Sequence, residues 1–299
     1  MPPRRKCGAM QVHERLAETY ATFRANQDQI QRFTERSVLT GEAQRVLRRR
    51  ITIPVVVHVV YRTDRENISK AQINSQIAVL NRDFRARNPD KSKVPDIWKG
   101  LVANANITFA LATKNPKGGS TTGVTRTKTN QRSFAADDSV KSVRAGGVAA
   151  WPTNRYLNVW VCNLGEQLLG YAQFPGGPAR TDGVVILHSA FGTSGTAASP
   201  FNRGRTTTHE IGHWLNLRHI WGDTIDCSGT DFVADTPTAQ MPNYGKPSFP
   251  HLSCNNGPNG DMFMNYMDYV DDAAMLMFTV GQATRMNACL AGPRKKLGL

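Results

Sequence analysis

The sequence lacks the features of several common protein classes. No run of roughly eighteen apolar residues occurs, which excludes a membrane-spanning helix. The opening residues, MPPRRKCGAM, contain no apolar stretch, so no secretory signal is visible. Either such a signal has been removed or the protein does not use that route. No internal repeat is evident either.

Cysteine is also scarce. The chain holds five cysteines in 299 residues, and their spacing fits neither a dense disulfide scaffold nor a C-x-x-C site. Because five is an odd number, at least one thiol must be unpaired. The five are Cys7, Cys162, Cys227, Cys254 and Cys289.

Positive charge, by contrast, is abundant. With 37 Lys and Arg against 23 Asp and Glu, the formal net charge is +14, which raises the possibility of an anionic partner. The basic residues are spread along the chain, however, and no nucleic-acid-binding motif accompanies them. We therefore expect no nucleic-acid partner. The densest basic cluster contains Arg45 and Arg48–Arg50.

The first fifty residues differ in composition and residue pattern from the rest. Residues 10–36 contain no Gly or Pro and place apolar side chains at helical spacing from Val12 to Phe23, which predicts a helix. The basic cluster follows, and the chain then changes to the β-branched run ITIPVVVHVVY, which predicts a buried strand from Ile51. The boundary near residue 50 is the clearest in the sequence.

The remaining chain predicts a mixed α/β half followed by a mostly irregular half. A long helix is expected over 69–87, because Ser69 is a good N-cap and apolar residues follow at helical spacing. The other expected elements are strands at 106–113, 156–164, 169–175 and 183–189, a loop at 115–132, helices at about 206–217 and 279–291, and an irregular region at 222–262.

The segment HEIGHWLNLRH carries the chemistry. His209 and His213 are four residues apart, so on a helix both imidazoles project from one face and can bind one ion. Zinc suits this pair, and Glu210 lies beside the metal, where it can accept a proton from a bound water. A third ligand, His219, requires the chain to turn at Asn216, a residue that tolerates the left-handed conformation.

This segment resembles the long zinc-binding motif of the metzincins, and specifically that of the pappalysin family and its ulilysin-like members. The resemblance covers about residues 50–290. It implies an α+β catalytic domain, with a twisted mixed sheet and helices and then an irregular C-terminal half, preceded by a short helical propeptide. It also implies a Met-turn at Met267, as an apolar floor under the three imidazoles, and an oxyanion-stabilising role for Tyr269.

The N-terminal segment suggests latency. Cys7 precedes Gly8 at the start of the chain, and a thiolate there could take the zinc position that catalysis reserves for water. The pappalysin relatives place a similar cysteine in their propeptides. We therefore expect residues 1–50 to be a propeptide that inhibits its own enzyme and 51–299 to be the catalytic domain, divided into 51–219 and 220–299.

The resemblance also places an acidic floor in the pocket for the residue after the scissile bond. Asp272 matches that position, although the adjacent Asp271 could serve instead. A carboxylate there would favour arginine through a charge-assisted pair. Because arginines also lie at the expected processing site, Arg45–Arg50, the enzyme could mature itself. Gly170, Tyr171 and Ala172 would form the upper edge of the cleft, where an extended substrate pairs.

The resemblance further implies one disulfide and a calcium site. Cys227 and Cys254 match one family disulfide, while Lys246 and Ala274 stand where a second pair would be. Cys162 and Cys289 are expected to be buried thiols. Asp231 and Thr236 are the first-choice calcium ligands, because calcium prefers carboxylate, hydroxyl and carbonyl oxygens.

We thus predict a zinc-dependent endopeptidase, latent as made, acting on protein or peptide substrates. We expect a secreted monomer, since a disulfide and a zymogen suggest export. The main rival is a non-catalytic zinc module, but a structural zinc site usually has four protein ligands and would not need Glu210. A basic nucleic-acid binder is a more distant alternative.

Overall fold

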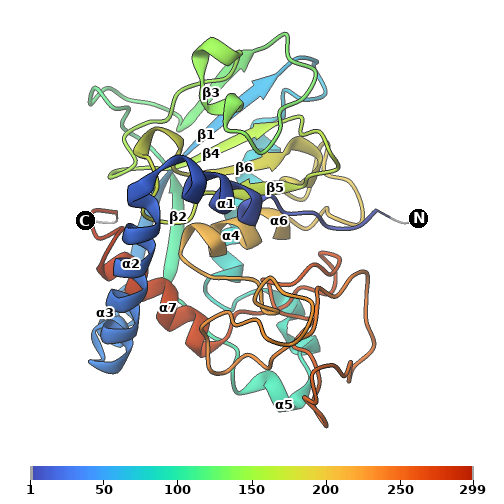
Figure 1. Ribbon diagram of the computed structural model, residues 1–299. Helices are drawn as coiled ribbons and strands as arrows, with labels where there is room; N and C mark the ends of the chain where they lie inside the picture. The colour runs from blue at the N-terminus through green and yellow to red at the C-terminus, as the bar shows by residue number, and fades with distance from the viewer. Residues whose placement is uncertain (1–2, 298–299) are drawn as a thin grey trace.

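A mixed sheet forms one half of the molecule in the computed structural model, which describes residues 3–297 (Figure 1). The strand order is β2-β1-β4-β6-β5, and β3 also pairs with β1. All pairings are parallel except that of β5 with β6. The strands are β1 (Ile51–Tyr61), β2 (Ile107–Leu111), β3 (Val124–Lys128), β4 (Leu157–Cys162), β5 (Gly170–Ala172) and β6 (Val184–Leu187).

Helices cover the sheet and fill the space below it. They are α1 (Ala9–Thr19), α2 (Ala21–Leu39), α3 (Glu42–Leu47), α4 (Lys70–Asp83), α5 (Asp96–Lys99), α6 (Arg205–Trp214) and α7 (Val280–Ala291). Short 3-10 turns are η1 (Pro89–Lys93), η2 (Ser139–Lys141), η3 (Val143–Ala145), η4 (Ala179–Thr181) and η5 (His188–Ala190). Among the described residues, no helix combines the length and apolarity that crossing a membrane would need.

Strand β1 lies inside the sheet, paired with β2, β3 and β4, and its side chains are mostly apolar on both faces. Val55, Val56, Val57, Val59 and Val60 are all fully buried, as the β-branched run predicts for an inner parallel strand. Helix α6 packs against β5 and β6 and carries the metal-binding motif into the middle of the molecule (Figure 1).

The chain after α6 is irregular. The helix ends at Trp214, two residues before Asn216, which has a φ of 75° and turns the chain as predicted. From there to Val280 the described residues form turns and isolated bridges, in agreement with the irregular region expected over 222–262. Regularity returns at α7, where Thr279 and Gln282 form a capping box.

Two predictions need correction: one helix is divided in two, and one loop contains a strand. The helix expected over 10–36 breaks at Tyr20, whose backbone is extended, so that α1 lies near β5 while α2 turns away along α7. The loop expected over 115–132 contains β3, because the alternating VTRTK pairs with residues 57–61 of β1, beyond the 51–55 that β2 pairs. Long-range packing decided both cases: no Gly or Pro marks the break at Tyr20, and the Gly and Pro residues ahead of Val124 favour a loop.

The N-terminal segment is an integral layer of the molecule. Its first residues cross between the sheet and the irregular half, and α2 and α3 then pack along α7 (Figure 1). Val12, Leu16 and Phe23 are at most 1% exposed and join a cluster that includes Trp160 and Tyr171.

Candidate metal centre and substrate cleft

Three imidazoles converge at the centre of the molecule. The Nε2 atom of His213 lies 3.1 Å from Nε2 of His209 and 3.0 Å from Nε2 of His219. Helix α6 supplies the first two from one face, and the turn at Asn216 brings the third back to them. All three rings are buried.

The opposite nitrogen of each ring is hydrogen-bonded. Each Nδ1 faces an oxygen that can only accept, so Nδ1 carries the proton and Nε2 is left with a lone pair. The acceptors are Tyr266 O for His209 at 2.7 Å, Leu217 O for His213 at 2.8 Å, and a carboxylate oxygen of Asp223 for His219. Such outer partners commonly orient metal-binding histidines.

These residues fit a zinc ion. Three lone pairs that face one another about 3 Å apart repel unless a cation lies between them, and tetrahedral zinc would set the nitrogens about 3.3 Å apart. Burial, and secondly the neighbouring imidazoles, keep the pKa values of His209 and His213 well below their ordinary value, so both rings are neutral as a metal requires.

Cys7 completes the cluster. Its Sγ and the three imidazole nitrogens all lie within 4.8 Å of one another. The backbone holds it there, because Gly8 N donates to Gly170 O at 2.9 Å and Leu169 N donates to Lys6 O at 3.0 Å. The thiol therefore sits on the edge of β5, beside the three histidines, as a fourth ligand would.

Glu210 lies between this thiol and β5. Its Oε2 is 3.4 Å from Cys7 Sγ, and burial raises the pKa of its carboxyl to about 8. A Cβ atom on Gly170 would come within 2.9 Å of the Glu210 Cγ, so only glycine leaves room for this carboxyl. Tyr171 and Ala172 continue the same buried strand.

Met267, the residue predicted for a Met-turn, packs against α6. Met267 is fully buried, and a Cβ atom on Gly212 would collide with its sulfur, so α6 and the turn are in close contact. The Tyr269 ring is 4.9 Å from the His219 ring and 5.8 Å from the His209 ring, and its hydroxyl donates to Cys7 O at 3.5 Å. Tyr269 thus packs beside two of the three imidazoles and reaches the backbone of Cys7.

A buried pocket beside the cluster of histidines holds an arginine of the N-terminal segment. Arg5 donates to Asp272 Oδ1 at 2.6 Å, to Thr206 Oγ1 at 2.9 Å and to Val270 O at 3.2 Å, and its guanidinium lies over the Phe201 ring. The side chains of Arg5 and Asp272 are 1% and 0% exposed. The three acceptors form a receptor for one guanidinium group.

Of the two carboxylates considered for this pocket, Asp272 lines it. Asp271 lies partly exposed, and its backbone NH bonds Gly245 O on another turn. Sequence reasoning missed Arg5, although it lies two residues before Cys7 and so on the same side of an extended chain. It also missed Asp223 and Thr206, which carry no signal beyond their proximity to the motif.

The cysteines away from the metal are as expected. Cys227 and Cys254 form a disulfide, and Cys162 and Cys289 are buried free thiols. At the expected calcium site, Asp231 Oδ2 accepts from the Thr236 hydroxyl at 2.7 Å.

The fold and this centre define a metalloprotease with a metzincin-like architecture. A family model described as pregnancy-associated plasma protein-A, peptidase M43, matches residues 140–291. An extracellular metalloprotease of Arthroderma benhamiae is 30% identical over 246 residues, which cover 79% of this chain and 76% of that protein. The chain belongs to this M43, or pappalysin, family of metalloproteases.

Two solved structures from Tannerella forsythia are also similar. Mature mirolysin in complex with a cleaved peptide matches with a TM-score of 0.83 and 53% identity, over 84% of this chain and 96% of that one. A promirolysin mutant matches with a TM-score of 0.90 and 47% identity, over 98% and 97%. The N-terminal helices thus resemble those of a proenzyme, whereas the particular likeness to ulilysin stays a prediction.

Proposed function

We propose that this protein is a latent zinc endopeptidase that cleaves peptide bonds before arginine and removes its own N-terminal segment. Residues 1–50 would be the propeptide, and 51–299 the catalytic domain, made of 51–219 and 220–299. One observation carries the proposal: the N-terminal segment places Cys7 at the metal centre and Arg5 in the neighbouring pocket.

His209, His213 and His219 would hold the zinc ion, which when bound lowers the pKa of a water ligand and polarises the scissile carbonyl. Glu210 takes the proton from the attacking water and passes it to the leaving amine. The Tyr269 hydroxyl donates a hydrogen bond to the developing oxyanion. In the latent form Cys7 lies against Glu210, so neither the water nor the substrate has access.

Arg5 indicates the substrate preference. A guanidinium can be buried only where acceptors neutralise it, and the pocket supplies Asp272, Thr206 and Val270 O around Arg5. A substrate arginine after the scissile bond would take the same position once the propeptide has left. Its backbone would pair along Gly170–Ala172, the edge that the propeptide now occupies.

Self-processing is supported by the exposure of the expected site. Arg45 lies in the last turn of α3, Arg48–Arg50 connect that helix to β1, and all four are exposed. A protease reaches such a connection more readily than the buried strand that follows. We infer that the propeptide is cut there by a second copy of the enzyme.

We also propose export and a calcium ion. The relative from Arthroderma benhamiae is named as extracellular, and a disulfide persists best outside the cytosol. Asp231 and Thr236 would bind calcium, because their side-chain oxygens lie 2.7 Å apart and Asp231 is only 5% exposed. Calorimetric titration of Ca²⁺ into wild-type protein and Asp231→Asn tests the site: equal binding would exclude it.

Peptide hydrolysis tests the proposed activity. The full-length protein, loaded with zinc and matured, should cleave a peptide with Arg after the scissile bond faster than one with Ala there. A zinc chelator should stop the reaction, and Glu210→Gln should lower kcat at least about a hundredfold while zinc content is unchanged. Zinc binding without hydrolysis, even after thiol modification of Cys7, would instead indicate a non-catalytic zinc module.

A further inference from the structure

The pocket carboxylate is anchored at the start of α6. Asp272 Oδ2 accepts from the backbone NH of Arg203 at 2.7 Å and from that of Arg205 at 3.3 Å. These bonds fix Oδ2 and leave Oδ1 to face the guanidinium of Arg5. The residue that donates one of these bonds, Arg205, therefore lies directly behind the pocket.

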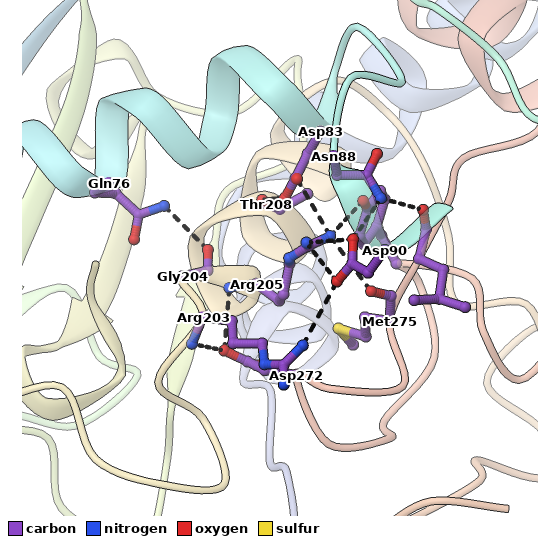
Figure 2. A network of polar contacts seen from close by, with 12 residues as sticks. Gln76, Asp83, Asn88, Asp90, Arg203, Gly204, Arg205, Thr208, Asp272 and Met275 are labelled. Atoms are coloured by element: carbon purple, nitrogen blue, oxygen red, sulfur yellow. Dashed lines mark hydrogen bonds and ion pairs between the residues drawn. The ribbon is translucent and has the colours of Figure 1, made fainter. Parts of the chain in front are cut away.

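The Arg205 side chain is itself held by two other carboxylates. Arg205 lies between Asp272 on one side and Asp83 and Asp90 on the other (Figure 2). Its Nη1 is 3.2 Å from Asp83 Oδ1, and its Nη2 is 3.1 Å from both oxygens of Asp90. Nη1 also donates to the Tyr266 hydroxyl.

This cluster is buried except at Arg203, which is 46% exposed and whose Nη1 lies 3.7 Å from Asp90 Oδ2. The side chains of Arg205, Asp83 and Asp90 are 6%, 1% and 11% exposed. Burial alone would lower the pKa of Arg205, but Tyr266, Asp83 and Asp90 raise it above its ordinary value. Burial also raises the pKa of Asp83 to about 6, although Arg205 opposes that rise. The guanidinium thus stays charged, and both of its terminal nitrogens are paired.

We propose that Asp83 and Asp90 determine specificity from behind the pocket, by neutralising Arg205 so that the charge of Asp272 stays available to a cationic substrate side chain. A guanidinium without these partners, on the residue whose backbone NH binds Asp272, would offset the negative charge of the pocket and repel a substrate arginine. The two carboxylates lie on α4 and η1, away from the substrate, so they act through Arg205. The inference rests on the proposed preference for arginine.

A comparison of arginine with citrulline tests the inference. Citrulline has nearly the shape of arginine without its charge, so the ratio of kcat/KM for two peptides that differ only in this residue measures the electrostatic preference. The zinc-loaded full-length protein, matured by wild-type enzyme in trans, would be assayed as wild type and as Asp90→Asn. We expect Asp90→Asn to lower the arginine-to-citrulline ratio about three- to tenfold, mainly through a higher KM for the arginine peptide.

A matched control lies at the other end of α6. Asp182 has the same side-chain exposure as Asp90, 11%, pairs with Arg294 at 2.7 Å and accepts from the Trp214 indole. Asp182→Asn should disturb α6 without changing the ratio, whereas Asp90→Glu, which keeps the charge, should restore it.

Equal losses for both peptides in Asp90→Asn would overturn the inference and leave only a structural role for the cluster. A wild type that treats arginine and citrulline alike would overturn the proposed arginine preference as well. Because these outcomes differ in the wild-type enzyme, failure of the inference is distinguishable from failure of the proposed function.

Discussion

At the scale of single residues, we assign latency to two side chains of the N-terminal segment, and only one of them stands out in the sequence. Cys7 is conspicuous because a thiol ahead of a zinc motif has an evident chemical use. Arg5 is one of many arginines in a chain with 37 Lys and Arg, so its place in the Asp272 pocket follows from the fold. Both occupy positions that we assign to the reaction.

Replacing Arg5 should therefore weaken latency. Arg5→Ala removes one partner of a buried ion pair, which costs about 3–5 kcal/mol when the other charge stays buried. We expect self-processing of the zinc-loaded protein to be at least about tenfold faster, as followed by gel or mass spectrometry. Lys6→Ala is the control, because Lys6 is exposed and its side chain donates only to Glu166 O. A lag for Arg5→Ala as long as that of wild type would contradict this role.

His58 should make stability depend on pH. Burial between strands lowers its pKa to about 4, against an ordinary value of 6.5. Between these values the unfolded chain binds more protons, so the free energy of unfolding falls as the pH falls, by roughly 2 kcal/mol from pH 7 to pH 5. Urea unfolding of the Glu210→Ala protein at both pH values should show this loss, and adding His58→Gln should reduce it by that amount. An unchanged difference would exclude His58 as the cause.

At the scale of elements, the helices, strands and turns that depend on a local residue pattern could be predicted from the sequence. The β-branched run of β1, the Ser69 cap of α4 and the left-handed turn at Asn216 are local properties, and all three are present. The break at Tyr20 and the pairing of β3 depend on partners distant in sequence, which no local pattern reveals. For the same reason the three histidines could be predicted as ligands from one segment, while Tyr266 O, the acceptor of His209, could not.

Helix α1 packs the N-terminal segment against the sheet. Leu16 is 1% exposed in a cluster with Tyr171, so Leu16→Ala should cost about 2–5 kcal/mol of docking free energy. In the Glu210→Ala protein, which cannot process itself, a thiol reagent should then label Cys7 at least about tenfold faster. Glu18→Ala, on the exposed face of the same helix, should leave the rate unchanged. Equal labelling of both variants would show that α1 does not hold Cys7 in place.

At the scale of the whole molecule, the N-terminal segment completes both the core and the cleft. It fills the arginine pocket, the metal centre and an apolar face of the sheet, and it reconnects to β1 through exposed arginines. An enzyme that prefers arginine and ends its propeptide in arginines can activate by cutting other copies of itself. The family membership is established by similarity, whereas this activation route is our proposal.

The most direct test is intact-mass analysis of the full-length protein incubated with zinc and calcium, beside Glu210→Ala. We predict that the wild type loses its first 44–50 residues over time and that Glu210→Ala stays whole by itself but is cut when wild-type enzyme is added. Wild-type protein that stays intact and hydrolyses no arginine peptide, even after Cys7 is modified, would contradict the assignment of a self-activating endopeptidase.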